Sequence, residues 1–96
     1  MRIEFDPAKD RINQQKHGVS LAVAASLDWD EALYWLDERH DYGETRILAL
    51  APDTGVVYFV AFVDRASTRR VISLRRANRR EVRRYVQATE DADPDA

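Results

Sequence analysis

The chain has 96 residues, of which 45% are hydrophobic and 33% are charged. This length suits one domain around a single core, and the composition is typical of a folded, soluble protein rather than a disordered or fibrous one. The lack of cysteine excludes disulfide scaffolds, thiol nucleophiles and cysteine-ligated metal centres. No apolar run reaches the ~18 residues of a membrane span, and no signal-peptide pattern is present, so we expect a cytoplasmic protein without a membrane segment.

The formal net charge of −2 conceals an uneven distribution of charge. Residues 65–84 contain nine arginines and one acid, Glu81, and carry a charge of +8, whereas the rest of the chain carries −10. We call residues 65–84 the arginine-rich segment. Because the planar guanidinium group suits phosphate and carboxylate, this segment predicts an anionic partner. RNA, DNA and an acidic protein all remain candidates at this point.

The first third of the chain predicts a short strand and two helices. Residues 2–5 alternate polar and apolar side chains, as a half-buried strand does. Asp6 and Pro7 are typical of a helix start, and we expect a helix over residues 7–17 that ends at Gly18. Its thin apolar content indicates that it covers an edge rather than fills a core. Ser20 has the position of a cap for a second, largely apolar helix over residues 21–27.

Four strands are predicted along the middle of the chain. Apolar and β-branched side chains favour strands over residues 32–36, 46–51, 56–63 and 69–76, separated by turns at 37–43, 52–55 and 64–67. The eight consecutive apolar residues 56–63 are typical of a central strand that is buried on both faces. Simple alternation along the last strand places Arg69, Val71, Ser73 and Arg75 on one face and Arg70, Ile72, Leu74 and Arg76 on the other.

A final helix follows the last strand. Asn78 and Glu81 have the spacing of a capping box, and Val82, Tyr85 and Val86 then face inward. Residues 90–96 form a flexible acidic tail in this interpretation. We therefore expect one α+β domain over residues 1–89, in which two N-terminal helices and a C-terminal helix pack on an antiparallel sheet of about four to five strands.

Several enzyme classes are excluded by what the sequence lacks. It has no glycine-rich phosphate loop, no GxSxG motif and no pair of histidines at metal-ligand spacing, so we expect no metal and no cofactor. Cleavage of RNA without metal requires a base for the 2′-hydroxyl, cations for the phosphorane and an acid for the 5′-oxygen. The residue types that could supply these groups occur at Lys16, His17, Glu44, Arg46, Arg70, Arg75 and Arg76.

Most of these side chains also have a purely structural interpretation. His17 could complement the dipole of its helix, and Glu81 is better explained as a capping residue than as a general base. Tyr85 has the spacing of a core residue with an exposed hydroxyl. The arginines of the last helix could form a solvated face, although a face without balancing acids is unusual.

Four sequence elements taken together resemble the BrnT family of toxins. They are Phe5-Asp6-Pro7-Ala8-Lys9, Lys16-His17-Gly18-Val19-Ser20, Gly43-Glu44-Thr45-Arg46, and Arg70–Ala77 followed by Arg79-Arg80-Glu81 and Tyr85. The resemblance implies a RelE-like fold and a ribonuclease that stops translation. It also implies a DNA-binding antitoxin partner, BrnA, and a complex that represses its own operon.

The resemblance and the residue chemistry together define the expected site. We expect catalytic roles for Lys16, His17, Glu44, Arg46, Arg70 and Arg75, and substrate-binding roles for Ser73, Arg76, Arg79, Arg80 and Tyr85. The resulting hypothesis is a metal-independent endoribonuclease toxin of a type II toxin–antitoxin system. A BrnA-type antitoxin would neutralise it in a heterotetramer and would make the DNA contacts. The alternative is a non-catalytic, arginine-rich interaction module that binds an acidic partner or nucleic acid.

Overall fold

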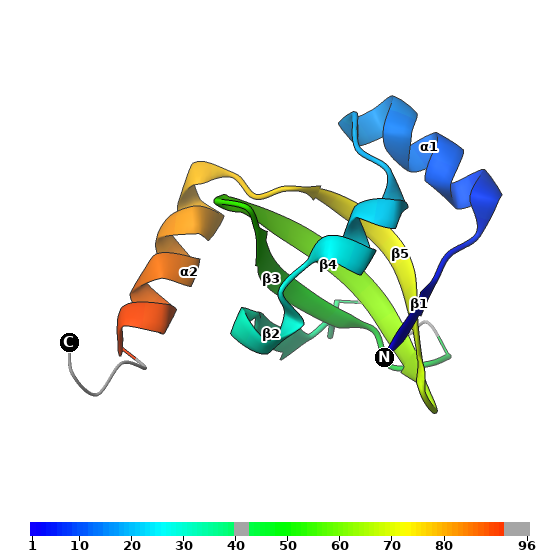
Figure 1. Cartoon of the computed structure of the whole chain (residues 1–96). Helices are drawn as coiled ribbons and strands as arrows, with labels where there is room; N and C mark the ends of the chain where they lie inside the picture. The colour runs from blue at the N-terminus through cyan, green and yellow to red at the C-terminus, as the bar shows by residue number, and fades with distance from the viewer. Residues whose placement is uncertain (40–42, 92–96) are drawn as a thin grey trace.

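A five-stranded sheet in the order β1-β5-β4-β3-β2 forms the centre of the computed structural model, which describes residues 1–39 and 43–91. The strands are β1 (Arg2–Glu4), β2 (Leu33–Leu36), β3 (Ile47–Asp53), β4 (Val56–Arg65) and β5 (Thr68–Arg76). Helix α1 (Pro7–His17) and the 3₁₀ turns η1 (Leu21–Ser26) and η2 (Trp29–Glu31) lie between β1 and β2, and α2 (Arg79–Asp91) follows β5. Figure 1 shows α1 above one end of the sheet and α2 beyond the other.

The predicted α+β class is confirmed, but the antiparallel sheet is wrong in one respect. Strands β2, β3, β4 and β5 pair antiparallel, whereas β1 pairs with β5 in parallel, so the sheet is mixed. Residues 40–42 of the predicted turn and residues 92–96 of the predicted tail lie outside the described residues. None of the described helices has the length and apolar character that spanning a bilayer requires.

The second N-terminal helix predicted over residues 21–27 is not confirmed, because residues 21–26 form the 3₁₀ turn η1 rather than an α-helix. Leu21, Ala24 and Leu27 are the buried side chains of this segment, whereas Ala22 and Ala25 are exposed. A 3₁₀ turn has three residues per turn and therefore places positions three apart on one side. The spacing of the apolar contacts thus explains why this winding replaces the α-helix.

The predicted helix boundaries are confirmed by their caps. The Asp6 carboxylate accepts a hydrogen bond from the Ala8 N–H at 2.8 Å, and Gly18 ends α1 with a left-handed φ of 73°. At the start of α2, the Asn78 N–H donates to the Glu81 carboxylate at 2.9 Å, and the Glu81 N–H donates to the Asn78 Oδ1 at 2.8 Å. This is the capping box that the sequence predicted.

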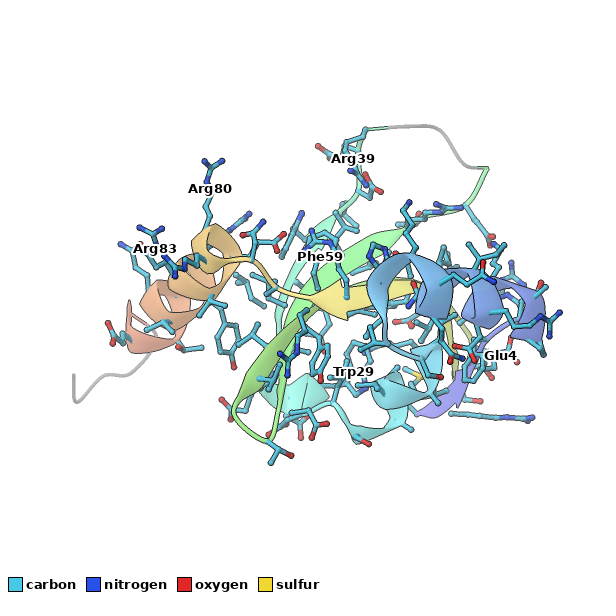
Figure 2. The ribbon with its side chains drawn as sticks, turned by 90° about the horizontal axis from the view of Figure 1, so that it is seen from above. Glu4, Trp29, Arg39, Phe59, Arg80 and Arg83 are labelled. Carbon is cyan, nitrogen blue, oxygen red and sulfur yellow. The ribbon has the colours of Figure 1, made fainter. Side chains whose placement is uncertain are left out.

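The two faces of the sheet differ in what covers them. Val60 and Phe62 of β4 point to the face that packs against η1, which we call the covered face, and both are fully buried there. Phe59 and Ala61 point to the opposite face, which we call the second face. Residues 60–63 are all buried but residues 56–59 are half-buried, so the predicted burial of this central strand on both faces is confirmed only for residues 60–63. Figure 2 shows Trp29 and Phe59 on opposite sides of the sheet.

A β-bulge at Ile72 overturns the simple alternation predicted for β5. Ala61 of β4 is opposite Ser73, whereas the next residue, Phe62, is opposite Val71, so Ile72 is the extra residue. Val71 and Leu74 consequently both enter the core of the covered face. The bulge also puts the three predicted site residues of β5 on one face, the second face: Arg70, Ser73 and Arg75.

Helix α2 extends past the sheet instead of lying across it (Figure 1). It is attached through its first turns, where the Tyr85 hydroxyl donates to the Glu31 carbonyl at 2.7 Å and the Arg84 guanidinium lies over the Trp35 ring. Val86 was predicted to face inward, but it is 43% exposed, because the helix has passed the sheet edge there. The arginine side chains of α2 are exposed, as predicted.

Candidate functional site

A single buried amide attaches α1 to the edge of β5. Strand β1 pairs only with residues 68–70, so the outer edge of β5 beyond the bulge has no neighbouring strand. There the Asn13 amide accepts from the Leu74 N–H at 3.1 Å and donates to the Leu74 carbonyl at 2.8 Å. It also donates to the Val19 carbonyl at 2.9 Å, just after the helix end. Asn13 thereby fixes the last turn of α1 beside β5, which confirms that this helix covers an edge.

This attachment creates a surface pocket of about 310 Å³ between α1 and the strands, which we call the α1–β5 pocket. Predicted site residues from three separate elements line it: Lys16 and His17 at the end of α1, Arg46 just before β3, and Ser73 in β5. Lys9, Ile12, Asn13 and Ile72 complete the lining. The pocket therefore combines one imidazole with three cationic side chains and little acidic surface, which is a favourable environment for a phosphate group.

The imidazole of His17 is held toward its neutral form. Burial lowers the pKa of His17 below its ordinary value, and the positive charges of Lys16 and Arg75 lower it further. A neutral imidazole has a free ring nitrogen that accepts a proton at neutral pH. His17 is therefore better suited to act as a general base than to carry a permanent positive charge that complements the helix dipole.

Arg75 lies at the boundary between the α1–β5 pocket and the middle of the second face. Its guanidinium donates two hydrogen bonds to the Glu81 carboxylate, at 2.8 and 2.9 Å, and its Cζ lies 4.4 Å from the Phe59 ring centroid. These contacts fix the direction of Arg75. The hydrogen bonds from Arg75 also lower the pKa of Glu81, as the Asn78 N–H does, against the opposing effect of burial. Glu81 is thus an ionised partner of Arg75 and the cap of α2, as its structural interpretation required.

Besides Arg75, two more predicted catalytic residues lie outside the lining of the α1–β5 pocket. The Glu44 carboxylate forms an exposed ion pair with Arg65 at 2.8 Å. Arg70 shares the second face with Ser73 but extends to the Glu4 carboxylate of β1, at 3.1 Å. The structure therefore brings Lys16, His17, Arg46 and Ser73 together, places Arg75 at their side, and leaves Glu44 and Arg70 outside the pocket.

The predicted substrate-binding residues are spread over a wider surface. Arg76 is exposed and lies on the covered side of β5, opposite Tyr58, so it points away from Ser73 and Arg75. Arg79 and Arg80 are exposed at the start of α2, and Figure 2 shows Arg80 extending away from the helix. Burial raises the pKa of Tyr85, and the nearby carboxylates of Glu31 and Asp28 raise it further, so its hydroxyl stays protonated in its bond to the backbone.

Three residues that contribute to this region were missed by the sequence reasoning. Asn13 is a buried polar residue on a helix with almost no apolar face, and that combination was its available signal. Lys9 lines the pocket because it lies two turns before Lys16 on the same side of α1. Phe59 had no signal of its own, because its contact with Arg75 depends on the bulge.

The arrangement supplies the groups required for cleavage of a phosphodiester without a cofactor. It has a neutral base, cations around one small volume and a hydroxyl from Ser73. In the described ranges, 1–39 and 43–91, no three histidine, aspartate or glutamate side chains converge as metal ligands.

Comparison with known proteins identifies the same class of chemistry. A search of curated proteins finds no match to the chain. The family model described as the ribonuclease toxin BrnT of type II toxin–antitoxin systems matches residues 5–81, which include the whole lining of the α1–β5 pocket and Arg75. With most of its length covered by that model, the chain belongs to the BrnT family of ribonuclease toxins.

Proposed function

We propose that this chain is an endoribonuclease that cleaves RNA in the α1–β5 pocket without a metal ion. The observation that carries the proposal is the position of His17: its pKa is lowered, and it shares one pocket with Lys16, Arg46 and Ser73. A phosphate in the pocket would meet cations on three sides, and the 2′-hydroxyl beside it would meet a neutral imidazole.

The proposed reaction is an internal transfer at phosphorus. The 2′-oxygen of the ribose attacks the adjacent phosphorus, and its proton passes to the free ring nitrogen of His17. Lys16, Arg46 and Arg75 stabilise the negative charge that develops on the phosphorane oxygens. The bond from phosphorus to the 5′-oxygen breaks, and the leaving oxygen takes a proton from the Lys16 ammonium or from water. The products are a 2′,3′-cyclic phosphate and a free 5′-hydroxyl.

The charge of the pocket supports a mechanism that does not use a metal ion. Its lining carries the side chains of Lys9, Lys16 and Arg46, which repel a divalent cation and perform the charge stabilisation that a metal would otherwise supply. Cleavage in the presence of EDTA is therefore the expected result.

The partner of this toxin is the antitoxin that a type II system implies. We propose that a BrnA-type antitoxin inhibits cleavage by covering the α1–β5 pocket and Arg75, in a complex of two toxins and two antitoxins. Because the pocket carries several cationic side chains, we expect the antitoxin to contact it through acidic side chains. DNA binding would belong to the antitoxin, and loss of translation would follow from cleavage of RNA.

The test is an RNA cleavage assay in EDTA with the wild type, His17→Gln and Arg75→Ala. We expect both substitutions to reduce the cleavage rate by at least 100-fold while circular dichroism shows an unchanged fold. Arg11→Ala is the matched control for loss of a positive charge, because Arg11 is exposed on α1 and does not line the pocket. Tight RNA binding by the wild type without any cyclic phosphate product would favour the non-catalytic interaction module instead.

A further inference from the structure

The second face carries a continuous layer in which two arginine side chains flank two aromatic rings. The Arg75 Cζ lies 4.4 Å from the Phe59 ring centroid, and the Arg84 Cζ lies 4.5 Å from the Trp35 ring centroid. The two rings contact each other edge to face, with centroids 5.9 Å apart and planes at 63°. Four side chains from β5, β4, β2 and α2 thus form one line, which we call the stacking layer: Arg75, Phe59, Trp35 and Arg84.

This layer adjoins the α1–β5 pocket at one end and a second hollow at the other. Arg75 is close enough to His17 for its charge to influence the imidazole. Beyond Arg75, a pocket of about 380 Å³ lies between the sheet and the first turns of α2. Trp35, Phe59 and Arg84 line it, and Leu48 and Leu50 form its apolar part. A chain bound with its phosphate at His17 would therefore continue directly onto the stacking layer.

A comparison with the covered face shows that the stacking layer is not merely structural. There, the Arg69 side chain also lies over aromatic rings, those of Trp29 and Phe62, but it is only 12% exposed and forms an ion pair with Asp64 at 2.8 Å. Arg84 is exposed and has no ion pair with any residue in the described part of the chain. The covered-face arginine is a closed contact, and Arg75 is also held by its ion pair with Glu81, whereas the Arg84 end of the stacking layer remains open to a ligand.

We propose that the stacking layer binds the bases of single-stranded RNA next to the phosphate held in the α1–β5 pocket. Bases stack on guanidinium planes as well as on aromatic rings, and Arg84 lies on the Trp35 ring with its outer face exposed to a base. The exposed Arg80 at the rim of the same hollow would meet the RNA backbone. This proposal rests on the proposed function, because it extends the substrate beyond the scissile phosphate.

The chemistry of the hollow favours a base over a phosphate and a single strand over a duplex. The Glu81 carboxylate in this hollow is already paired with Arg75, and the apolar part formed by Leu48 and Leu50 suits a flat base better than a charged phosphate. In a duplex the bases are stacked on each other, so their faces are not available to Trp35 or Phe59. An acidic protein segment would use the charge of Arg80 and Arg84 but would leave the rings unused.

The experiment measures binding to a single-stranded RNA octamer with 2′-O-methyl groups, which cannot be cleaved by attack of the 2′-oxygen. We expect Trp35→Ala and Arg84→Ala each to raise the dissociation constant on the order of tenfold, since one stacked base is lost. Arg84→Lys is expected to weaken binding nearly as much, because it keeps the charge and loses the planar group. With a cleavable octamer, Trp35→Ala should raise KM and leave kcat at saturation within about twofold.

Two control variants separate stacking from general effects. Leu36→Ala changes an exposed apolar residue of the same strand that points to the opposite face, and Arg83→Ala removes the same charge from the adjacent position of α2. Both should bind the octamer as the wild type does.

The tryptophan fluorescence of the wild type should fall on binding and should stay constant in Trp35→Phe, where Trp29 remains.

The outcomes distinguish this proposal from the proposed function. If the wild type cleaves RNA and Trp35→Ala binds the octamer as tightly as the wild type, the stacking layer is refuted and the ribonuclease stands. If the wild type binds through Trp35 but never cleaves RNA, the ribonuclease fails and the binding surface stands. If the octamer leaves the fluorescence unchanged while the antitoxin quenches it, the layer is a protein-docking surface and the proposal is overturned.

Discussion

Replacing Asn13 with alanine should cost this small domain a large part of its stability. The Asn13 side chain is 5% exposed and takes part in three hydrogen bonds, two with the Leu74 backbone and one with the Val19 carbonyl. Alanine fills none of these roles, so the backbone groups on the outer edge of β5 lose their partners. The same change releases the last turn of α1, which carries Lys16 and His17.

The size of the effect follows from the hydrogen bonds. Each buried bond contributes about 0.5–1.5 kcal/mol net, so the loss of three corresponds to about 2–4 kcal/mol. A domain of this length has a total free energy of unfolding of about 5–14 kcal/mol. The melting temperature should fall by roughly 10 °C or more. Asn13→Asp should be at least as damaging, because its second oxygen would face the carbonyls of Leu74 and Val19 without a proton to donate.

The assay is urea unfolding followed by circular dichroism, with Gln14→Ala as the matched control. Gln14 is the next residue of α1, is exposed, and bonds only to the Asp10 carboxylate on its own helix. Its loss should change the free energy of unfolding by less than about 0.5 kcal/mol. A loss below about 1 kcal/mol for Asn13→Ala would show that water satisfies the β5 edge and that the amide is not what attaches α1.

Three further predictions concern charged side chains. The pKa of His17 lies below its ordinary value of about 6.5, so in a pH–rate profile the cleavage rate should decrease only below that pH, where the imidazole becomes protonated. Lys16→Gln removes a neighbouring positive charge and should move this decrease to higher pH, whatever it does to the maximum rate. The pKa of Glu81 is lower in the folded protein than its unfolded value near 4.5, so the ionised carboxylate stabilises the fold above that pH. In thermal melts this contribution should disappear as the pH falls from about 4.5 toward the lower folded-state pKa, and Glu81→Gln should flatten the pH dependence of the melting temperature. Arg69→Ala should destabilise the fold by about 1–2 kcal/mol in urea unfolding, more than Arg83→Ala, because it removes a largely buried guanidinium from its contacts with the Trp29 and Phe62 rings.

Local sequence signals predicted the helix ends and the central strand because these depend on neighbours in the chain. Asp6, Gly18 and the pair of Asn78 and Glu81 act on backbone groups within a few residues, so their roles are visible without tertiary structure. The conformation of residues 21–26 was not predictable in this way. Their composition suits an α-helix, and only the requirement that every third side chain reach the sheet selects the 3₁₀ turn.

The candidate site shows the same limit more clearly. The residue types at positions 16, 17, 46 and 73 were predicted from chemistry and resemblance, but simple alternation put Arg70 and Arg75 on opposite faces of one strand. A single extra residue at the Ile72 bulge reverses the pattern over half the strand. Nothing in the local sequence marks this position as a bulge, since it carries neither glycine nor proline. The pairing with β4 alone determines it.

The ion pairs in the structure also change the interpretation of the arginine-rich segment. Four of its nine arginines, at positions 65, 69, 70 and 75, form ion pairs: three with acids of the sheet and its loops, and Arg75 with Glu81 of α2. Part of the charge of +8 is therefore neutralised within the fold and holds strands together. In the described ranges, the arginines of α2 have no such pairs.

Cationic side chains are concentrated in two places, the α1–β5 pocket and the first turns of α2. The stacking layer joins them across the second face. A protein with a net charge of −2 can thus attract a phosphate chain locally while its acidic remainder repels polyanions elsewhere. Because that repulsion acts on any polyanion and stacking acts only on exposed bases, the balance favours single-stranded RNA over duplex DNA at the same phosphate density. Salt should also weaken duplex binding more steeply than binding of the octamer, because a duplex has the higher charge density and releases more counterions for each phosphate that the protein neutralises.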